Sequence, residues 1–117
     1  MTKVLYSSAG TFQKDVIESN VPVLVDFYAD WCGPCRAIAP LLNKLAGELD
    51  GRVKIIKIDV DAEKEIAAKY QIDSIPSLLF FSKGQLAQRS AGLMSESALR
   101  NILTKLAGAS AAEKIAS

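Results

Sequence analysis

Short apolar runs alternate with segments of helical periodicity along this chain. The longest run, residues 21–29, is almost continuously apolar and rich in β-branched side chains, which is typical of a strand covered on both faces. A second buried strand is predicted over residues 52–60. Three further strands are predicted over residues 3–6, 77–81 and 85–91, and the last two are close enough to form an antiparallel hairpin.

Helical periodicity fills the segments between these strands. Helices are predicted over residues 11–19, 35–49 and 61–70, the last with Asp61 as its N-cap. A final amphipathic helix is predicted to begin at Ser95. The resulting order, β-α-β-α-β-α-β-β-α, predicts an α/β fold with three layers: a central mixed five-stranded sheet with four helices divided between its two faces.

The length of 117 residues corresponds to one domain, which we assign to residues 1–107. Residues 108–117 are small and polar and are predicted to form a short, flexible C-terminal tail. The formal net charge of +1 gives the chain no general attraction to nucleic acid or to anionic membranes. We therefore expect neither as a partner, and we expect a monomer.

Two features of the composition narrow the chemistry further. The absence of histidine excludes Ser-His-Asp and Cys-His catalysis and histidine ligation of a metal. The sequence shows no signal-like apolar stretch at its start and no window near the roughly 18 apolar residues of a membrane span. We expect a cytoplasmic protein, and there a pair of cysteines more often does thiol chemistry than holds a structural disulfide.

Both cysteines lie in one pentapeptide, Trp31-Cys32-Gly33-Pro34-Cys35, between a predicted strand and a predicted helix. At a helix start, unpaired backbone N–H groups and the helix dipole favour the thiolate of Cys32, which makes it the candidate nucleophile. Cys35, one turn later, could attack a mixed disulfide on Cys32. Gly33 leaves the backbone open to a substrate, and Pro34 suits a first helical turn.

Two other interpretations of the cysteine pair stay open at this point. The pair could form a stable structural disulfide, although closing so small a loop would restrict the unfolded chain little. A dimer could also pool four cysteines around a metal ion. We expect no metal and no cofactor beyond the Cys32-Cys35 pair itself, since no dinucleotide-binding motif is present.

Asp26 interrupts the longest apolar run, where an ionised carboxylate is costly. Its pKa should be raised, which makes it a candidate base for Cys35. Lys57, in the other buried strand, could pair with Asp26 or orient water between them. The alternative is that each side chain reaches an edge and is only solvated. The Ile75-Pro76 bond precedes a predicted strand, and the sequence alone favours its trans form.

From about residue 4 to residue 107, these residues together resemble the thioredoxin family. The WCGPC motif is the specific element. Supporting matches are Asp26-Phe27, Ala29, Pro40, Lys57, Asp61, Ile75-Pro76, Gly84 and Gly92.

This resemblance implies a thioredoxin-like fold and a reducing thiol–disulfide oxidoreductase. It implies that Cys32 attacks, Cys35 resolves, and Asp26 deprotonates Cys35, and that Pro76 is cis and faces the cysteines. The apolar surface that holds a substrate backbone would comprise Trp31, Pro34, Ile75 and Gly92. The implied partners are oxidised proteins and an external thioredoxin reductase, NADPH-linked or ferredoxin-linked.

Departures from the family pattern are Tyr28 in place of a common tryptophan, Arg36 in place of a common lysine and Ser77 in place of a common threonine. Two rival functions remain at this stage: a binding subunit that uses the apolar rim without turnover, and an oxidase or isomerase with a less reducing couple.

Overall fold

The computed structural model describes residues 4–116. In that part of the chain the elements follow the predicted order. They are β1 (Leu5–Tyr6), a short π-helical segment η1 (Gln13–Ile17), β2 (Val23–Tyr28), α1 (Gly33–Glu48), β3 (Lys54–Asp59), α2 (Lys64–Lys69), β4 (Ser77–Ser82), β5 (Gln85–Ala91) and α3 (Glu96–Ala116).

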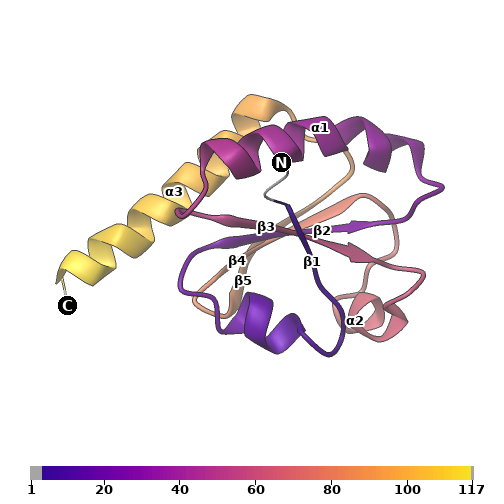
Figure 1. Ribbon diagram of the computed structural model, residues 1–117, viewed down its shortest axis with the longest axis horizontal. Helices are drawn as coiled ribbons and strands as arrows, with labels where there is room; N and C mark the ends of the chain where they lie inside the picture. Colours follow the sequence, from indigo (N-terminus) through magenta and orange to yellow (C-terminus); the bar gives the residue numbers. More distant parts are fainter. Residues whose placement is uncertain (1–3, 117) are drawn as a thin grey trace.

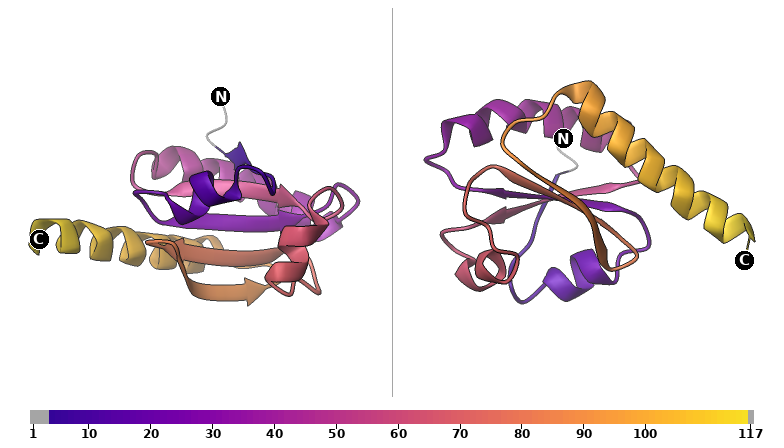
Figure 2. Two further views of the ribbon diagram at one scale, coloured as in Figure 1. Left: turned by 90° about the horizontal axis from the view of Figure 1, so that it is seen from below. Right: turned by 180° about the vertical axis from the view of Figure 1, so that it is seen from behind.

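The five strands form one mixed sheet in the order β1-β3-β2-β4-β5, which confirms the predicted architecture. Strands β1, β3 and β2 are parallel, and β4 and β5 are antiparallel to their neighbours. Figure 1 shows α1 and α3 above the sheet and η1 and α2 below it, and Figure 2 shows the same layers from two other sides. Parallel β2 and β3 therefore end at the same edge of the sheet, before α1 and α2.

Side chains of β2 alternate between two apolar cores. Val23, Val25 and Phe27 pack with η1 and α2, and Leu24 packs with α1 and α3. Burial of each large apolar side chain contributes about 1.5–3 kcal/mol, so the two cores hold the sheet rigidly between the helices. Asp26 shares the face of Leu24 and is the charged residue in an otherwise apolar strand.

Two details of the helices differ from the sequence predictions. Asp61 does not cap α2. The carboxylate of Asp59 accepts hydrogen bonds from the backbone of this turn instead, at 2.8 Å from Asp61 N and 3.4 Å from Ala62 N. Asp59 is at the end of β3, and α2 begins at Lys64, with Glu63 as an N-cap residue that makes no side-chain capping bond.

The last helix begins as predicted, with Ser95 Oγ accepting from Ala98 N at 3.2 Å. It continues to Ala116, beyond the predicted end near residue 107, and its C-terminal part projects past the sheet (Figure 1). The sequence beyond residue 107 is rich in alanine, the strongest helix former, and apolar periodicity does not register this propensity. The division of the chain at residue 107 remains a prediction.

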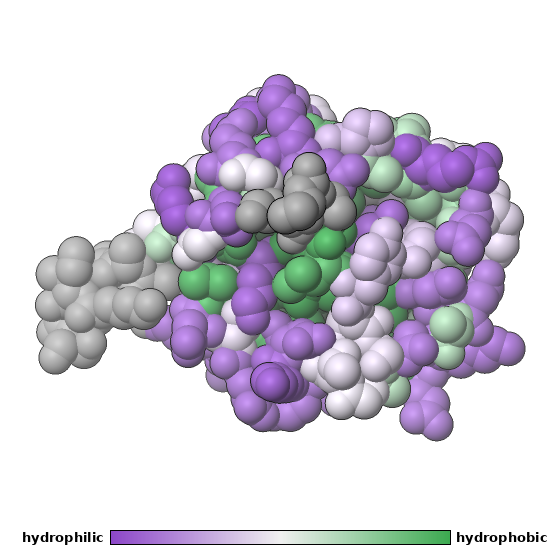
Figure 3. Space-filling view, viewed as in Figure 1, coloured by the Kyte–Doolittle hydropathy of each residue, from purple (hydrophilic) through white to green (hydrophobic). Residues whose placement is uncertain are grey.

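The face shown in Figure 3 carries apolar residues near its middle, ringed by hydrophilic ones. Leu5 on β1 is half exposed and, with Val21, Val53 and other residues, lines a pocket of 360 Å³. Among residues 4–116, the helices fall short of the length and apolar character needed to cross a membrane.

Candidate active site

Cys32 and Cys35 lie at the N-terminal end of α1 and form a disulfide in this structure, with Cα atoms 5.3 Å apart. Cys32 is the N-cap residue, and its Sγ accepts a hydrogen bond from Cys35 N at 3.2 Å. This donor and the positive end of the helix dipole would stabilise a thiolate on Cys32 after reduction. Both cysteines are buried, so little of either residue meets solvent.

The two residues between the cysteines leave the approach to the disulfide open. Gly33 and Pro34 are exposed, and Pro34 occupies the first turn of α1, as predicted. A Cβ atom added at Gly33 would meet no other atom within 4 Å, apart from its chain neighbours and helix backbone. The backbone of another protein can therefore come close to this turn.

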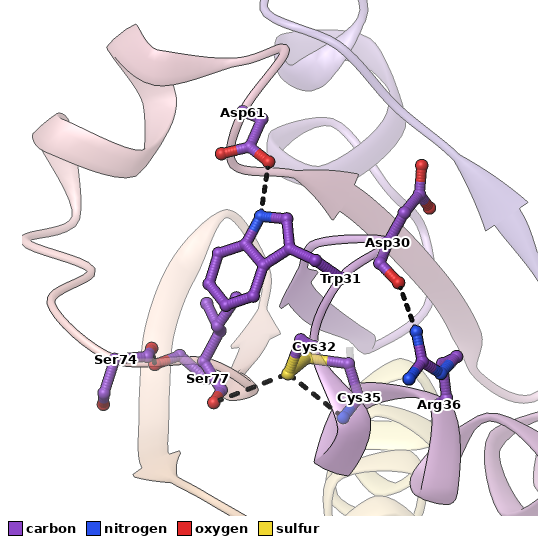
Figure 4. Close-up of a disulfide and its surroundings, with 9 residues drawn as sticks. Asp30, Trp31, Cys32, Cys35, Arg36, Asp61, Ser74 and Ser77 are labelled. Carbon is purple, nitrogen blue, oxygen red and sulfur yellow. Dashed lines mark hydrogen bonds between the residues drawn. A yellow bond between two sulfur atoms is a disulfide. The ribbon is translucent and has the colours of Figure 1, made fainter.

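A second loop faces the cysteines from the start of β4. The Ile75-Pro76 peptide bond is cis, as the family resemblance implied and the sequence alone did not. Cys32 Sγ lies 3.8 Å from the carbonyl oxygen of Ile75 (Figure 4). Gly92 N donates to Pro76 O at 2.7 Å, and a positive φ of 89° at Gly92 suits glycine. The fold thus places the Ile75-Pro76 loop against the disulfide, and Gly92 supports that loop through its bond to Pro76.

Trp31 is 67% exposed, yet its indole is held in place. Its Nε1 donates to Asp61 Oδ2 at 2.8 Å, and Figure 4 shows the ring directed toward that carboxylate. On the other side, Arg36 Nη1 donates to the backbone carbonyl oxygen of Asp30 at 2.7 Å. These two bonds fix the segment that precedes Cys32.

Sequence analysis missed this role of Asp61 and assigned it to a helix cap. A usable signal was present, because the parallel strands β2 and β3 end at the same edge and bring the loops that follow them together. The contact of Arg36 with the Asp30 carbonyl had no comparable signal, since it depends on the side-chain conformation at the start of α1.

Asp26 is fully buried, and neither carboxylate oxygen has a hydrogen-bond partner. Burial raises the pKa of Asp26 from its ordinary 3.8 to about 6, while the nearby positive charge of Lys57 opposes part of that shift. The elevated pKa expected from the sequence is therefore present. It lets the carboxyl group exchange a proton close to neutral pH.

Lys57 is the register partner of Asp26 on β3. It does not hydrogen-bond to Asp26, whose oxygens are unpaired. Its Nζ lies 4.2 Å from the ring centroid of Tyr28 instead. Lys57 and Cys35 both line a pocket of 350 Å³ beside α1, so the ammonium group and the second cysteine share one space.

The cysteine pair is the redox group of this site. Because the two sulfurs are bonded to each other, they are not available as thiolate ligands to a metal. Residues 4–116 contain no cluster that could hold a metal ion, where a cluster means three or more histidine, cysteine, aspartate or glutamate side chains.

Comparison with known proteins agrees with this geometry. The thioredoxin family model matches residues 3–105. The chain is 41% identical over 95 residues to thioredoxin 1 of a Nostoc species, covering 81% of this chain and 89% of that protein. It is 39% identical over 105 residues to thioredoxin of Haemophilus influenzae, covering 90% and 98%, and 48% identical over 88 residues to thioredoxin C-2 of Corynebacterium nephridii, covering 75% and 82%.

The family-model match spans the sheet, the cysteine turn and the cis-proline loop. Proteins of this kind reduce protein disulfides with no cofactor beyond their own cysteine pair, and a reductase returns the electrons. On the family match over most of its length and on its relatives, the chain belongs to the thioredoxin family and is a thiol–disulfide oxidoreductase.

Proposed function

We propose that the chain is a general protein-disulfide reductant in which Cys32 is the nucleophile, Cys35 the resolving thiol and Asp26 the base. The observation that carries this proposal is the cysteine pair at the open N-terminal end of α1, with Cys32 as the cap.

The reaction proceeds in two exchanges. The Cys32 thiolate attacks one sulfur of a substrate disulfide, forms a mixed disulfide and releases the other substrate sulfur as a thiolate that takes up a proton. Cys35 then loses its proton and attacks Cys32 Sγ, which releases the second substrate thiol. Two electrons pass to the substrate, and the chain is left with the Cys32-Cys35 disulfide seen in the structure.

Asp26 is suited to accept the proton of Cys35. Its carboxyl group is buried and unpaired, and its pKa of about 6 places the proton exchange near neutral pH. Its register partner Lys57 lines the same pocket as Cys35 and so links the two by way of one side chain. In this proposal Lys57 acts with Asp26 and orients water in that pocket.

The surface that receives the substrate is formed by the loops around the disulfide. Trp31 presents an exposed ring, and Pro34 and Gly33 leave the approach open. Ile75 contacts Cys32 from the other side, and Pro76, which follows it, is hydrogen-bonded to Gly92. A rim of this kind accepts an extended backbone with little demand on its side chains, which favours a range of protein substrates.

The proposal includes the electron donor and the compartment. A thioredoxin reductase, NADPH-linked or ferredoxin-linked, restores the dithiol. A dithiol that gives electrons to protein disulfides works where thiols are kept reduced, which supports the cytoplasm. We propose that the chain acts as a monomer, with neither nucleic acid nor a membrane as a partner.

Two matched cysteine variants test the roles. With an NADPH-linked reductase and insulin, the unaltered chain should reduce the interchain disulfides, and Cys32→Ser should fall to the rate without protein. Cys35→Ser should also lose turnover but accumulate a mixed disulfide on Cys32, visible by mass spectrometry under non-reducing conditions. Absence of the mixed disulfide in Cys35→Ser, or retained turnover in Cys32→Ser, would contradict the assignment.

Two further arms separate the rival functions. Turnover with dithiothreitol but not with the NADPH-linked reductase would indicate another donor, and a ferredoxin-linked reductase would be tried next. Failure with both donors and with dithiothreitol would favour a binding subunit. A glutathione equilibrium that places the Cys32-Cys35 couple near the potentials of disulfide isomerases, about −180 mV, would favour an oxidase or isomerase.

A further inference from the structure

The ammonium group of Lys57 is directed to aromatic rings although a carboxylate lies on the adjacent strand. Its Nζ is 4.2 Å from the ring centroid of Tyr28 and 5.9 Å from that of Tyr6. Both distances lie within the range of cation–π attraction. Asp26, in contrast, has no hydrogen bond to either oxygen.

The register of the parallel strands places both the tyrosine rings and the Asp26 carboxylate next to Lys57. On β3, Lys57 is the partner of Tyr6 on β1 and of Asp26 on β2. Tyr28 follows Asp26 by two residues and so projects from the same face of β2. The two tyrosine rings meet edge to face, with centroids 6.3 Å apart and planes at 68°. Lys57 therefore lies between an aromatic pair and a carboxyl group.

The following inference rests on the proposed role of Asp26. We propose that Tyr6 and Tyr28 are positioning residues whose ring faces hold the Lys57 ammonium and keep it from pairing with Asp26. A ring face attracts a cation without neutralising it. A direct ion pair would favour the ionised carboxylate and so weaken Asp26 as a proton acceptor for Cys35.

The other charged groups around Lys57 fit this arrangement. Asp59 is the register partner of Tyr28, and Asp30 and Arg36 line the pocket that Lys57 lines. Arg36 is held by the Asp30 carbonyl. Burial raises the pKa of Tyr28 to about 12, and smaller contributions come from the nearby groups Asp59, Tyr6, Asp30 and Asp26. The Tyr28 ring therefore stays neutral at physiological pH. Of these cations, Lys57 is the one whose charge acts on the pKa of Asp26.

Substitution of Tyr28 tests the proposal directly. Tyr28→Leu removes the ring face and Tyr28→Phe keeps it. The pKa of the Asp26 carboxyl, measured by carbon-13 NMR in the full chain, should fall by about half a unit in Tyr28→Leu and stay unchanged in Tyr28→Phe. An unchanged or higher Asp26 pKa in Tyr28→Leu, or an equal fall in Tyr28→Phe, would overturn the proposal.

Tyr6 offers a second variant at a surface that tolerates change, because its side chain is 67% exposed at the edge of the sheet. Tyr6→Leu should lower the Asp26 pKa in the same direction and by less, since the ring of Tyr6 is the more distant of the two. A rise in the Asp26 pKa would show that the freed ammonium goes to solvent, which contradicts the proposal.

A double-mutant cycle shows whether the effect passes through Lys57. In a Lys57→Met background, Tyr28→Leu should leave the Asp26 pKa unchanged, because no ammonium remains to be released. A shift that persists there would overturn the proposal. The NMR titration measures the pKa of Asp26 without any turnover, so its result does not depend on whether Asp26 is the base for Cys35. That role is tested separately, by the rate at which Cys35 releases a mixed disulfide in Asp26→Ala.

Discussion

Two charged regions of this molecule differ in whether their carboxylates have hydrogen-bond partners. On the outside of α1 and α3, Arg100 binds Glu48 through two hydrogen bonds of 2.7 and 3.0 Å and Glu96 through one of 2.8 Å, while Lys44 also binds Glu96. Hydrogen bonds from Arg100 hold the pKa values of Glu48 and Glu96 below their usual range. Inside, Asp26 is fully buried and has no hydrogen-bond partner.

The difference separates charge that links two helices from a buried charge whose chemical role is the one proposed above. In the outer network both carboxylates, Glu48 and Glu96, have hydrogen-bond partners. Water competes with these exposed bonds, so the network stabilises the fold only modestly and its contribution depends on salt. Asp26 destabilises the fold when it is ionised, because its buried carboxylate has no hydrogen-bond partner in the protein. The fold therefore tolerates an unpaired buried carboxylate, to which the proposed function gives the role of proton acceptor.

Removal of the Asp26 carboxyl group should give the larger effect on stability. The pKa of Asp26 is raised from 3.8 to about 6, so its contribution is full below pH 3.8 and is lost as the pH rises toward 6. Asp26→Ala should therefore gain about 3 kcal/mol in free energy of unfolding, relative to the unaltered chain, between acid and neutral pH. Urea unfolding at a series of pH values measures this difference.

The stability advantage of Asp26→Ala over the unaltered chain should grow as the pH rises from acid to neutral. Because the alanine introduced by Asp26→Ala has no titrating group, any constant packing loss shifts both ends of the pH series equally and leaves the difference intact. A difference between the two chains that stays constant across the series would show that Asp26 is not a strained carboxylate, and the comparison with the outer network would fail.

The outer network should give the smaller effect. Arg100→Met keeps much of the length of the side chain and removes the charge, so the free energy of unfolding should fall slightly because Glu48 and Glu96 lose their shared partner. The loss should shrink at about 1 M salt, where the screening length is about 3 Å. Insulin reduction should be unchanged. A loss that exceeds the Asp26 effect, or that salt does not alter, would contradict this account.

The sequence predicts most of the fold because its signals are local. The apolar run of residues 21–29 and the helical spacing after Cys35 are set by neighbours in the chain, and the mixed sheet follows from the alternation of strands and helices and from the final hairpin. The buried carboxylate at Asp26 is also visible, since a charged residue in the middle of a continuous apolar run is buried together with its neighbours.

The rest depends on which side chains meet across strands. Asp61 looks like a helix cap in sequence, and only the common edge of β2 and β3 brings it to Trp31. Lys57 looks like a partner for Asp26, and the register that also places Tyr6 beside it becomes known only when β1 is paired with β3. Periodicity describes one element at a time and cannot supply these contacts.

The most direct test of the central claim is the rate of the release step, in which Cys35 attacks the mixed disulfide. Stopped-flow single-turnover reduction of a peptide disulfide, between about pH 5 and 9, separates the first exchange from release of the second thiol. Asp26→Ala should leave the first exchange unchanged and slow release about a hundredfold at neutral pH, the lower end of general-base contributions. Equal release rates for the two chains at every pH would contradict the assignment of Asp26 as the base.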